Sequence, residues 1–100
     1  MVLLTHIPFG NVDQLKDANI NFNIILERFQ SSVIAVISAH SHTDQIRFFR
    51  DRSGGIFHFN FLHPSITSWS VNEPSFRVYQ FSNRGFEDFT QYSFDLKFHN

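Results

Sequence analysis

The chain has 100 residues, a formal net charge of −1 and no cysteine, which suits one small domain without disulfides or thiolate metal ligands. Hydrophobic residues make up 42% of it and 14 residues are Phe, so a packed core is expected rather than disorder. No basic cluster offers a nucleic-acid surface or a polybasic membrane patch, and no apolar run reaches the about 18 residues of a transmembrane helix.

The first forty residues predict a strand, a loop, a helix and a second strand. Val2–Leu4 is a short apolar run that predicts the first strand, and Val33–Ala39 predicts the second. Between them a helix is expected from Asn19 to Gln30, with Asn19 or Asn21 as its N-terminal cap. Its apolar positions recur at i, i+3, i+4 and i+7: Phe22, Ile25, Leu26 and Phe29. This β-loop-α-β order favours a parallel pair of strands.

The remaining sixty residues predict mainly strands. Gln45–Arg50 and Gly55–His63 flank a polar, glycine-containing link and are expected to form a β-hairpin. Phe76–Phe81 alternates in the same way, and a further strand or hairpin is expected over 86–98. His58, inside an aromatic strand, is expected to be a core histidine. The chain is therefore predicted to be one α+β segment, 1–100, with a β-rich C-terminal half.

Two histidines one residue apart follow the predicted strand Val33–Ala39, and a third follows Val2–Leu4. His40, His42 and His6 thus lie at strand ends, where polar side chains can reach a ligand. Without cysteine, imidazole is the best available ligand for an ion of the zinc class. Asp44 could accept the second ring N–H of a ligating histidine. The alternatives are ordinary core or exposed histidines, and a plain turn residue at Asp44.

Five segments, in this order, resemble the C-terminal part of calcineurin-like metallophosphoesterases, specifically their acid sphingomyelinase-like branch. Leu3–Gly10 is similar to the branch's Gly-His-Ile-Pro-Pro-Gly loop, and Ala39–Asp44 to its Gly-His-Thr-His-x-Asp loop. Phe61–Trp69 resembles its Ala-Pro-Ser-x-Thr segment, and Pro74–Tyr79 its Asn-Pro-x-Phe-Arg-x-Tyr strand. Gln91–Leu96 resembles the aromatic stretch that follows. The resemblance spans nearly the whole chain.

This resemblance implies a metallophosphoesterase sandwich of two sheets flanked by helices. It also implies two divalent metal ions at strand ends, which are expected to be zinc. His6 and His40 would bind one ion and His42 the other. It also implies hydrolysis of a phosphoester small molecule or of a phospholipid head group by metal-bound hydroxide, so that the protein supplies no nucleophile. Members of the family are often secreted or lysosomal, and the sequence does not assign this chain to a compartment.

The chain departs from the family pattern in two ways. Thr5 and Ala39 stand where the family has glycine. The family's Asp-x-His, Gly-Asp and Asn-His motifs normally precede the loop at His6, so the chain is expected to be the C-terminal part of a domain whose N-terminal half is absent. Alone it is expected to be inactive and to associate with that missing half or with itself. The alternative is a non-catalytic β-rich module that has lost the dinuclear site.

Overall fold

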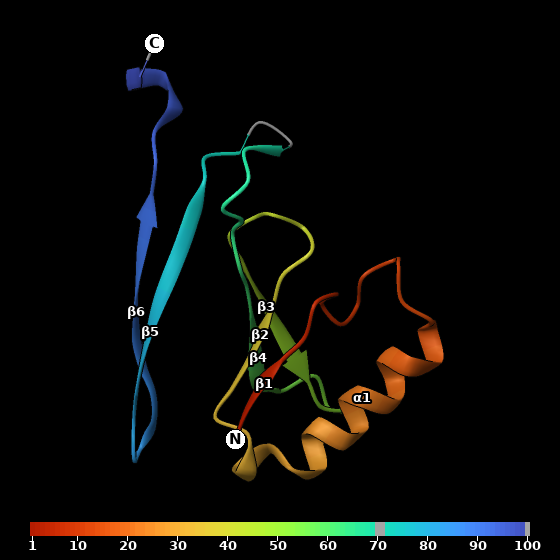
Figure 1. Cartoon of the computed structure of the whole chain (residues 1–100). Coiled ribbons are helices and arrows are strands. Elements are labelled where there is room, and N and C mark those ends of the chain that lie inside the picture. Colours follow the sequence, from red (N-terminus) through yellow and green to blue (C-terminus); the bar gives the residue numbers. More distant parts are fainter. Residues whose placement is uncertain (70–71, 100) are drawn as a thin grey trace.

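A computed structural model describes residues 1–69 and 72–99 and shows three layers (Figure 1). A four-stranded sheet in the order β1-β2-β4-β3 lies between one helix, α1, and a two-stranded hairpin, β5-β6. The elements are β1 Val2–Leu4, α1 Lys16–Arg28, β2 Ala35–Ser38, β3 Gln45–Arg50, β4 Ile56–Leu62, β5 Ser75–Ser82 and β6 Gly85–Ser93, with short 3-10 helices at Gln30–Ser32 and Leu96–His99. The fold is thus mixed α/β, consistent with the expected α+β class.

The strand pairing follows the predicted order. β1 pairs with β2 in parallel, with Leu3 opposite Val36, as the β-loop-α-β pattern indicates. β2 also pairs with β4 in parallel, and β4 pairs with β3 as an antiparallel hairpin. In the C-terminal half, the predicted strand Phe76–Phe81 lies within β5, which pairs with β6 in an antiparallel hairpin. A further strand or hairpin was expected over 86–98, but the strand ends at Ser93 and Leu96–His99 forms a 3-10 helix.

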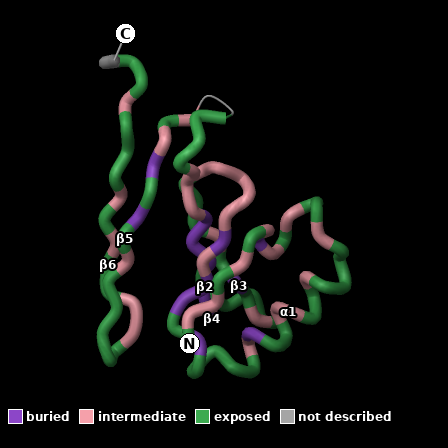
Figure 2. Tube along the Cα trace, in the orientation of Figure 1, coloured by how far each residue is buried: buried purple, intermediate pink, exposed green. Residues whose placement is uncertain are grey.

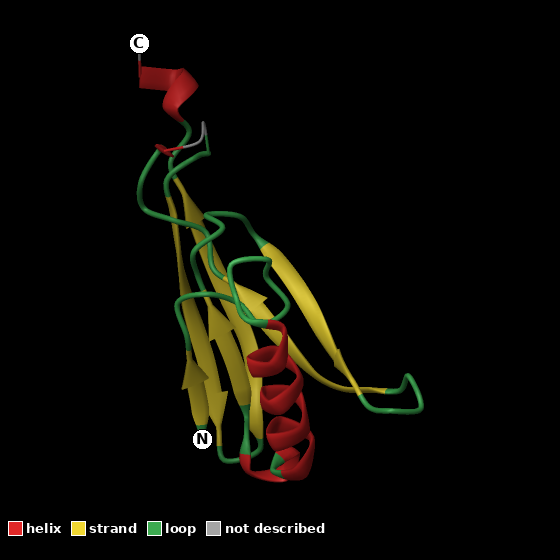
Figure 3. Cartoon of the chain, turned by 90° about the vertical axis from the view of Figure 1, so that its right-hand side faces the viewer, coloured by secondary structure: helices red, strands yellow, loops and turns green. Residues whose placement is uncertain are grey.

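Helix α1 begins earlier than its apolar stripe predicts, and the predicted caps are wrong. It starts at Lys16, and the residue before it, Leu15, makes no side-chain cap. Asn19 instead accepts a hydrogen bond at Oδ1 from the Gly10 N–H, at 2.8 Å. Of the predicted stripe only Leu26 is fully buried, while Ile25 keeps 55% of its surface exposed. Viewed from its own side, the helix runs along one face of the sheet (Figure 3).

The main core lies between α1 and the sheet and gathers Leu26, Val33, Val36 and Phe49. His58 belongs to this side of β4, since it pairs with Phe49 across the hairpin. It is 7% exposed, and its Nε2 lies 3.0 Å from the Val33 carbonyl oxygen while its Nδ1 accepts from the Phe59 N–H. His58 is therefore a satisfied core histidine, as expected from its place in the strand.

The hairpin covers the opposite face of the sheet only in part. Phe61 of β4 is 3% exposed because it contacts the rings of Tyr79, Phe86 and Phe89. Most of the hairpin is nevertheless exposed, and the buried residues concentrate in the sheet (Figure 2). In the part of the chain that is described, no helix has the length and apolar character needed to cross a membrane.

A buried polar chain links three neighbouring strands near their C-terminal ends. The Thr5 and Ser38 hydroxyls lie 2.7 Å apart, and the Ser38 hydroxyl donates to Asn60 Oδ1 at 3.0 Å. Ser38 and Asn60 are each 1% exposed. Thr5 stands where the motif that this segment resembles has glycine. Its side chain is accommodated because its hydroxyl takes part in this series of hydrogen bonds.

Replacing Ser38 with alanine is expected to lower the free energy of unfolding by about 1–3 kcal/mol, because Asn60 Oδ1 is then buried without a donor. Urea unfolding followed by circular dichroism measures the change. Ser31→Ala is the control, since Ser31 is exposed. Equal stability of the two variants would mean that the polar chain makes no net contribution.

Candidate metal site

The sheet brings His6 and His40 together, although 33 residues separate them in the sequence. Both follow neighbouring parallel strands, β1 and β2, whose C-terminal ends meet at one edge. Backbone hydrogen bonds continue beyond the strands, from the Thr5 N–H to the Ile37 carbonyl and from the Ala39 N–H to the His6 carbonyl, each at 2.9 Å. The two loops are therefore held in register up to the histidines.

The two imidazoles present nitrogens at a spacing that suits one metal ion. His6 Nε2 lies 3.3 Å from His40 Nδ1, with the ring centroids 5.1 Å apart and the ring planes at 79°. Two nitrogens bound to a tetrahedral zinc ion at about 2.0–2.1 Å are themselves about 3.3 Å apart. His6 and His40 thus fit two positions of a zinc coordination shell. Among residues 1–69 and 72–99, no group of three or more ligand side chains gathers around one point.

A carboxylate that the sequence did not single out lies beside this histidine pair, and the three side chains are called the histidine cluster here. Asp13 Oδ2 lies 3.0 Å from His40 Nε2, on the ring edge opposite His6. The His40 side chain is 35% exposed and that of Asp13 is 55% exposed, so the cluster is open to solvent. Asp13 lies in a loop between β1 and α1, 27 residues before His40, and no local sequence pattern marks the contact.

His42 is not part of this cluster. It lines a separate hollow of about 300 Å³ beside Asn72 and the hairpin residues Ser75, Gln91 and Ser93. Its backbone carbonyl accepts a hydrogen bond from Asn72 Nδ2 at 3.1 Å. This separation is compatible with a role for His42 at a second ion, which stays a prediction.

Asp44 lies against Arg77 and not against a histidine. Its Oδ1 forms an ion pair with Nη2 of Arg77, whose side chain is fully buried while that of Asp44 is 50% exposed. Burial by itself would lower the pKa of Arg77, but the hydrogen bond that Arg77 donates to Asp44 opposes this effect. Together with the interaction with Tyr79, it brings the pKa of Arg77 above its ordinary value. Asp44 thus accepts from Arg77 in this structure, and its expected role as acceptor for the ring N–H of a ligating histidine stays a prediction.

Arg77 anchors the loop Ala39–Asp44, called the histidine loop here because it carries His40 and His42, to the hairpin. Its Nε donates to Gln91 Oε1 at 2.7 Å, its Nη1 donates to the Leu62 carbonyl at 3.4 Å, and its guanidinium lies 4.5 Å above the Phe89 ring. The pair with Asp44 adds the segment that follows His42. One buried side chain therefore ties β4, β5, β6 and the histidine loop together.

Both histidines of the loop adopt left-handed backbone conformations. The φ angle is 69° at His40 and 57° at His42, while Ala39, where the family has glycine, is not in that region. A side chain with a Cβ is strained there by about 1–2 kcal/mol, and such strain often accompanies functional sites. The loop thus keeps two histidines at positions that glycine would fill with less strain.

Replacing His42 with glycine is expected to raise the free energy of unfolding by about 0.5–1 kcal/mol, because relief of strain exceeds the extra flexibility of the unfolded chain. Ala39→Gly, three residues earlier at an ordinary φ, is expected to lower it by a similar amount. Chemical unfolding of both variants is the measurement. A loss of stability in both would contradict the assigned backbone strain.

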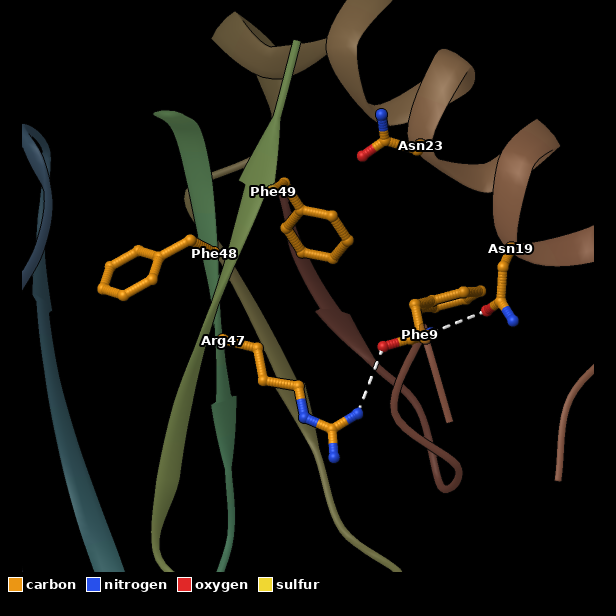
Figure 4. Close-up of a pocket in the computed structure, with 7 residues that line it drawn as sticks. Phe9, Asn19, Asn23, Arg47, Phe48 and Phe49 are labelled. Carbon is orange, nitrogen blue, oxygen red and sulfur yellow. Dashed lines mark hydrogen bonds between the residues drawn. The ribbon is translucent and has the colours of Figure 1, made fainter. Parts of the chain in front are cut away.

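A cavity of about 430 Å³ lies away from the histidines, between α1, β3 and the loop after β1 (Figure 4). Arg47 reaches across it and donates to the Phe9 carbonyl oxygen at 3.4 Å. Figure 4 also shows Phe48 and Phe49 pointing to opposite sides of β3, with Phe49 toward the helix. Since no histidine or carboxylate lines this cavity, it is separate from the histidine cluster.

The two imidazoles lie at the ends of neighbouring parallel strands in a mixed α/β fold. Comparison with known proteins adds to this observation. No family model matches the chain. It is 31% identical over 98 residues to sphingomyelin phosphodiesterase 2 of Caenorhabditis elegans, a match that covers 95% of the chain and 16% of that protein.

Two further relatives agree with this match. Identity is 26% over 102 residues to sphingomyelin phosphodiesterase 1 of Caenorhabditis elegans, covering 95% of the chain and 18% of the relative. Identity is 31% over 80 residues to sphingomyelin phosphodiesterase of Bos taurus, covering 78% of the chain and 12% of the relative. The chain is therefore similar to sphingomyelin phosphodiesterases along its length and spans less than a fifth of each of them.

Proposed function

We propose that this chain carries metal-ligand histidines of a phosphodiester hydrolase of the acid sphingomyelinase-like kind, within a calcineurin-like metallophosphoesterase sandwich. The observation that carries the proposal is the 3.3 Å approach of His6 Nε2 and His40 Nδ1. These residues come from two separate motifs that resemble that family. The similarity to sphingomyelin phosphodiesterases supports the same assignment.

In this proposal His6 and His40 hold one ion and His42 contributes to a second. A divalent ion of the zinc class, when bound, supplies a hydroxide nucleophile and neutralises charge on the phosphoryl oxygens. The chain's own part is to present imidazole nitrogens at fixed positions, through the paired loops after β1 and β2 and the anchor at Arg77. Three neutral ligands divided between two ions bind metal weakly, so further ligands from outside this segment are part of the proposal.

The proposed substrate is a phosphodiester, either a phosphocholine lipid head group or a nucleotide-type phosphoester. The segment alone is proposed to be inactive, because it spans less than a fifth of its relatives and its described residues contain no group of three or more metal ligands. Sphingomyelin and a chromogenic phosphodiester, each incubated with the zinc-loaded chain, test this statement. Turnover by the chain itself would overturn it.

Isothermal titration with Zn²⁺ tests the metal site directly. The wild-type chain is expected to bind one ion, and only weakly, because His6 and His40 supply two neutral nitrogens and no carboxylate. His6→Ala and His40→Ala are each expected to weaken binding by about tenfold or more, since each removes one of two nitrogens. His63→Ala is the matched control, because His63 is half-buried and its Nδ1 lies beside the Pro64 carbonyl oxygen, outside the cluster. Equal affinities in all four proteins would count against the site.

A second candidate function is a non-catalytic β-rich interaction module. It is favoured by one observation, the lack of a three-ligand group among the described side chains. Sequencing the transcript upstream of the Met1 codon separates the two proposals. In-frame Asp-x-His and Asn-His motifs would support the hydrolase, whereas their absence together with no zinc binding would support the module.

A further inference from the structure

We infer that Asp13 is the positioning residue of the metal site, where it fixes the ring orientation and the tautomer of His40. The inference rests on the proposed function and extends it to a residue outside both histidine motifs. The evidence is the chain of contacts from Asp13 Oδ2 to His40 Nε2, at 3.0 Å, and from His40 Nδ1 to His6 Nε2, at 3.3 Å.

The first step concerns the proton on His40. An ionised carboxylate only accepts hydrogen bonds, so the contact with Asp13 requires His40 Nε2 to carry the hydrogen. The other nitrogen of a neutral His40, Nδ1, is then a bare lone pair. This is the nitrogen that faces His6. Asp13 therefore holds His40 in the one neutral tautomer whose ligating nitrogen points at the site.

The second step concerns how Asp13 itself is held. Its N–H donates to Asn11 Oδ1 at 3.3 Å, and the Gln14 N–H donates to the Asn11 carbonyl at 3.2 Å, which forms a tight turn around Asp13. The Gln14 side chain fastens this turn by donating from Nε2 to the Ile7 carbonyl at 3.2 Å. This loop follows His6 in the sequence. The turn therefore holds Asp13 close to the rings of His6 and His40.

The third step concerns the alternative carboxylate. Asp44 is close to His42 in the sequence, but its charge is committed to the buried Arg77. Asp17, on α1, is exposed and lies four residues beyond Asp13. Carboxylates that accept the second ring N–H of a metal-ligating histidine typically change metal affinity by about 10–100-fold when removed. Asp13 is placed for that role at His40.

The test combines a readout without metal and one with metal. In metal-free protein, ¹H–¹⁵N spectra of the histidine side chains are expected to show His40 as the Nε2–H tautomer in the wild type and in Asp17→Ala. In Asp13→Ala the Nδ1–H tautomer is expected to appear. Asp13→Asn retains an oxygen acceptor, so it is expected to restore most of the Nε2–H form. Asp17→Ala controls for the loss of one exposed negative charge.

In zinc titrations, Asp13→Ala is expected to bind about 10–100-fold more weakly than the wild type. The affinity of the control, Asp17→Ala, is expected to lie within about twofold of that of the wild type. An unchanged His40 tautomer in Asp13→Ala would overturn the inference while leaving the ligands of the proposed function in place. Wild-type protein that binds no zinc would overturn the proposed metal site, and the positioning role with it. The two failures are therefore distinguishable.

Discussion

Asp44→Ala is expected to lower the free energy of unfolding by about 2–3 kcal/mol, a large share of the about 5–15 kcal/mol typical of a small domain. The Arg77 side chain is fully buried, so the substitution leaves its positive charge inside the protein without a counter-charge. The half-exposed Asp44 makes this cost smaller than for a fully buried pair. The measurement is the free energy of unfolding in urea.

Arg77→Met in the Asp44→Ala background is expected to make the protein about as stable as Arg77→Met alone, because it removes the unpaired buried charge and fills a similar volume with apolar atoms. Arg77→Met alone is expected to cost about 1–3 kcal/mol, since Gln91 Oε1 and the Leu62 carbonyl lose their donor. Because Asp44→Ala is expected to cost little once Arg77 is replaced, the double-mutant cycle should show a coupling of about 2–3 kcal/mol. Additive costs would mean that the pair does not anchor the histidine loop.

The strands could be predicted from the sequence because apolar alternation and turn residues act locally. Gln45–Arg50 was predicted with the bounds that the structure shows, and the parallel pairing of β1 and β2 followed from the β-loop-α-β order. The start of α1 could not be predicted, because the apolar stripe begins at Phe22 while Lys16 to Ala18 carry no apolar signal beyond one alanine. Asn19, the predicted cap, contacts Gly10 through the tertiary fold instead.

The site shows the same limit. The sequence placed His6 and His40 at the ends of two strands expected to be parallel, and the family resemblance paired them at one ion. The observed parallel pairing of β1 and β2 brings them together. Asp13 and Arg77 could not be found in this way. Asp13 reaches His40 through a turn whose shape depends on Asn11 and Gln14, and Arg77 reaches Asp44 from a different sheet. Contacts of this kind depend on three-dimensional packing and leave no periodic pattern in the sequence.

The outer edge of β3 is expected to make the isolated chain self-associate. In the described sheet β3 is an edge strand, so half of its backbone N–H and C=O groups have no strand partner. Ile46 and Phe48 point to the hairpin side of this strand but remain 48% and 55% exposed, because the hairpin covers that face only in part. An unpaired edge beside exposed apolar side chains favours pairing with another chain.

At about 100 µM, a range in which exposed edges and apolar surface lead to association, size-exclusion chromatography with light scattering is expected to show species larger than a monomer. A variant with Ile46→Lys and Phe48→Lys is expected to shift the chain to monomer, because charges on an edge strand oppose pairing. The matched control carries Ile20→Lys and Ile24→Lys on α1, whose side chains are 48% and 46% exposed. It adds the same charge and removes a similar amount of exposed apolar surface, so it is expected to remain associated. A wild-type monomer, or equal dispersal by both variants, would show that the β3 edge is not the surface through which the chain associates.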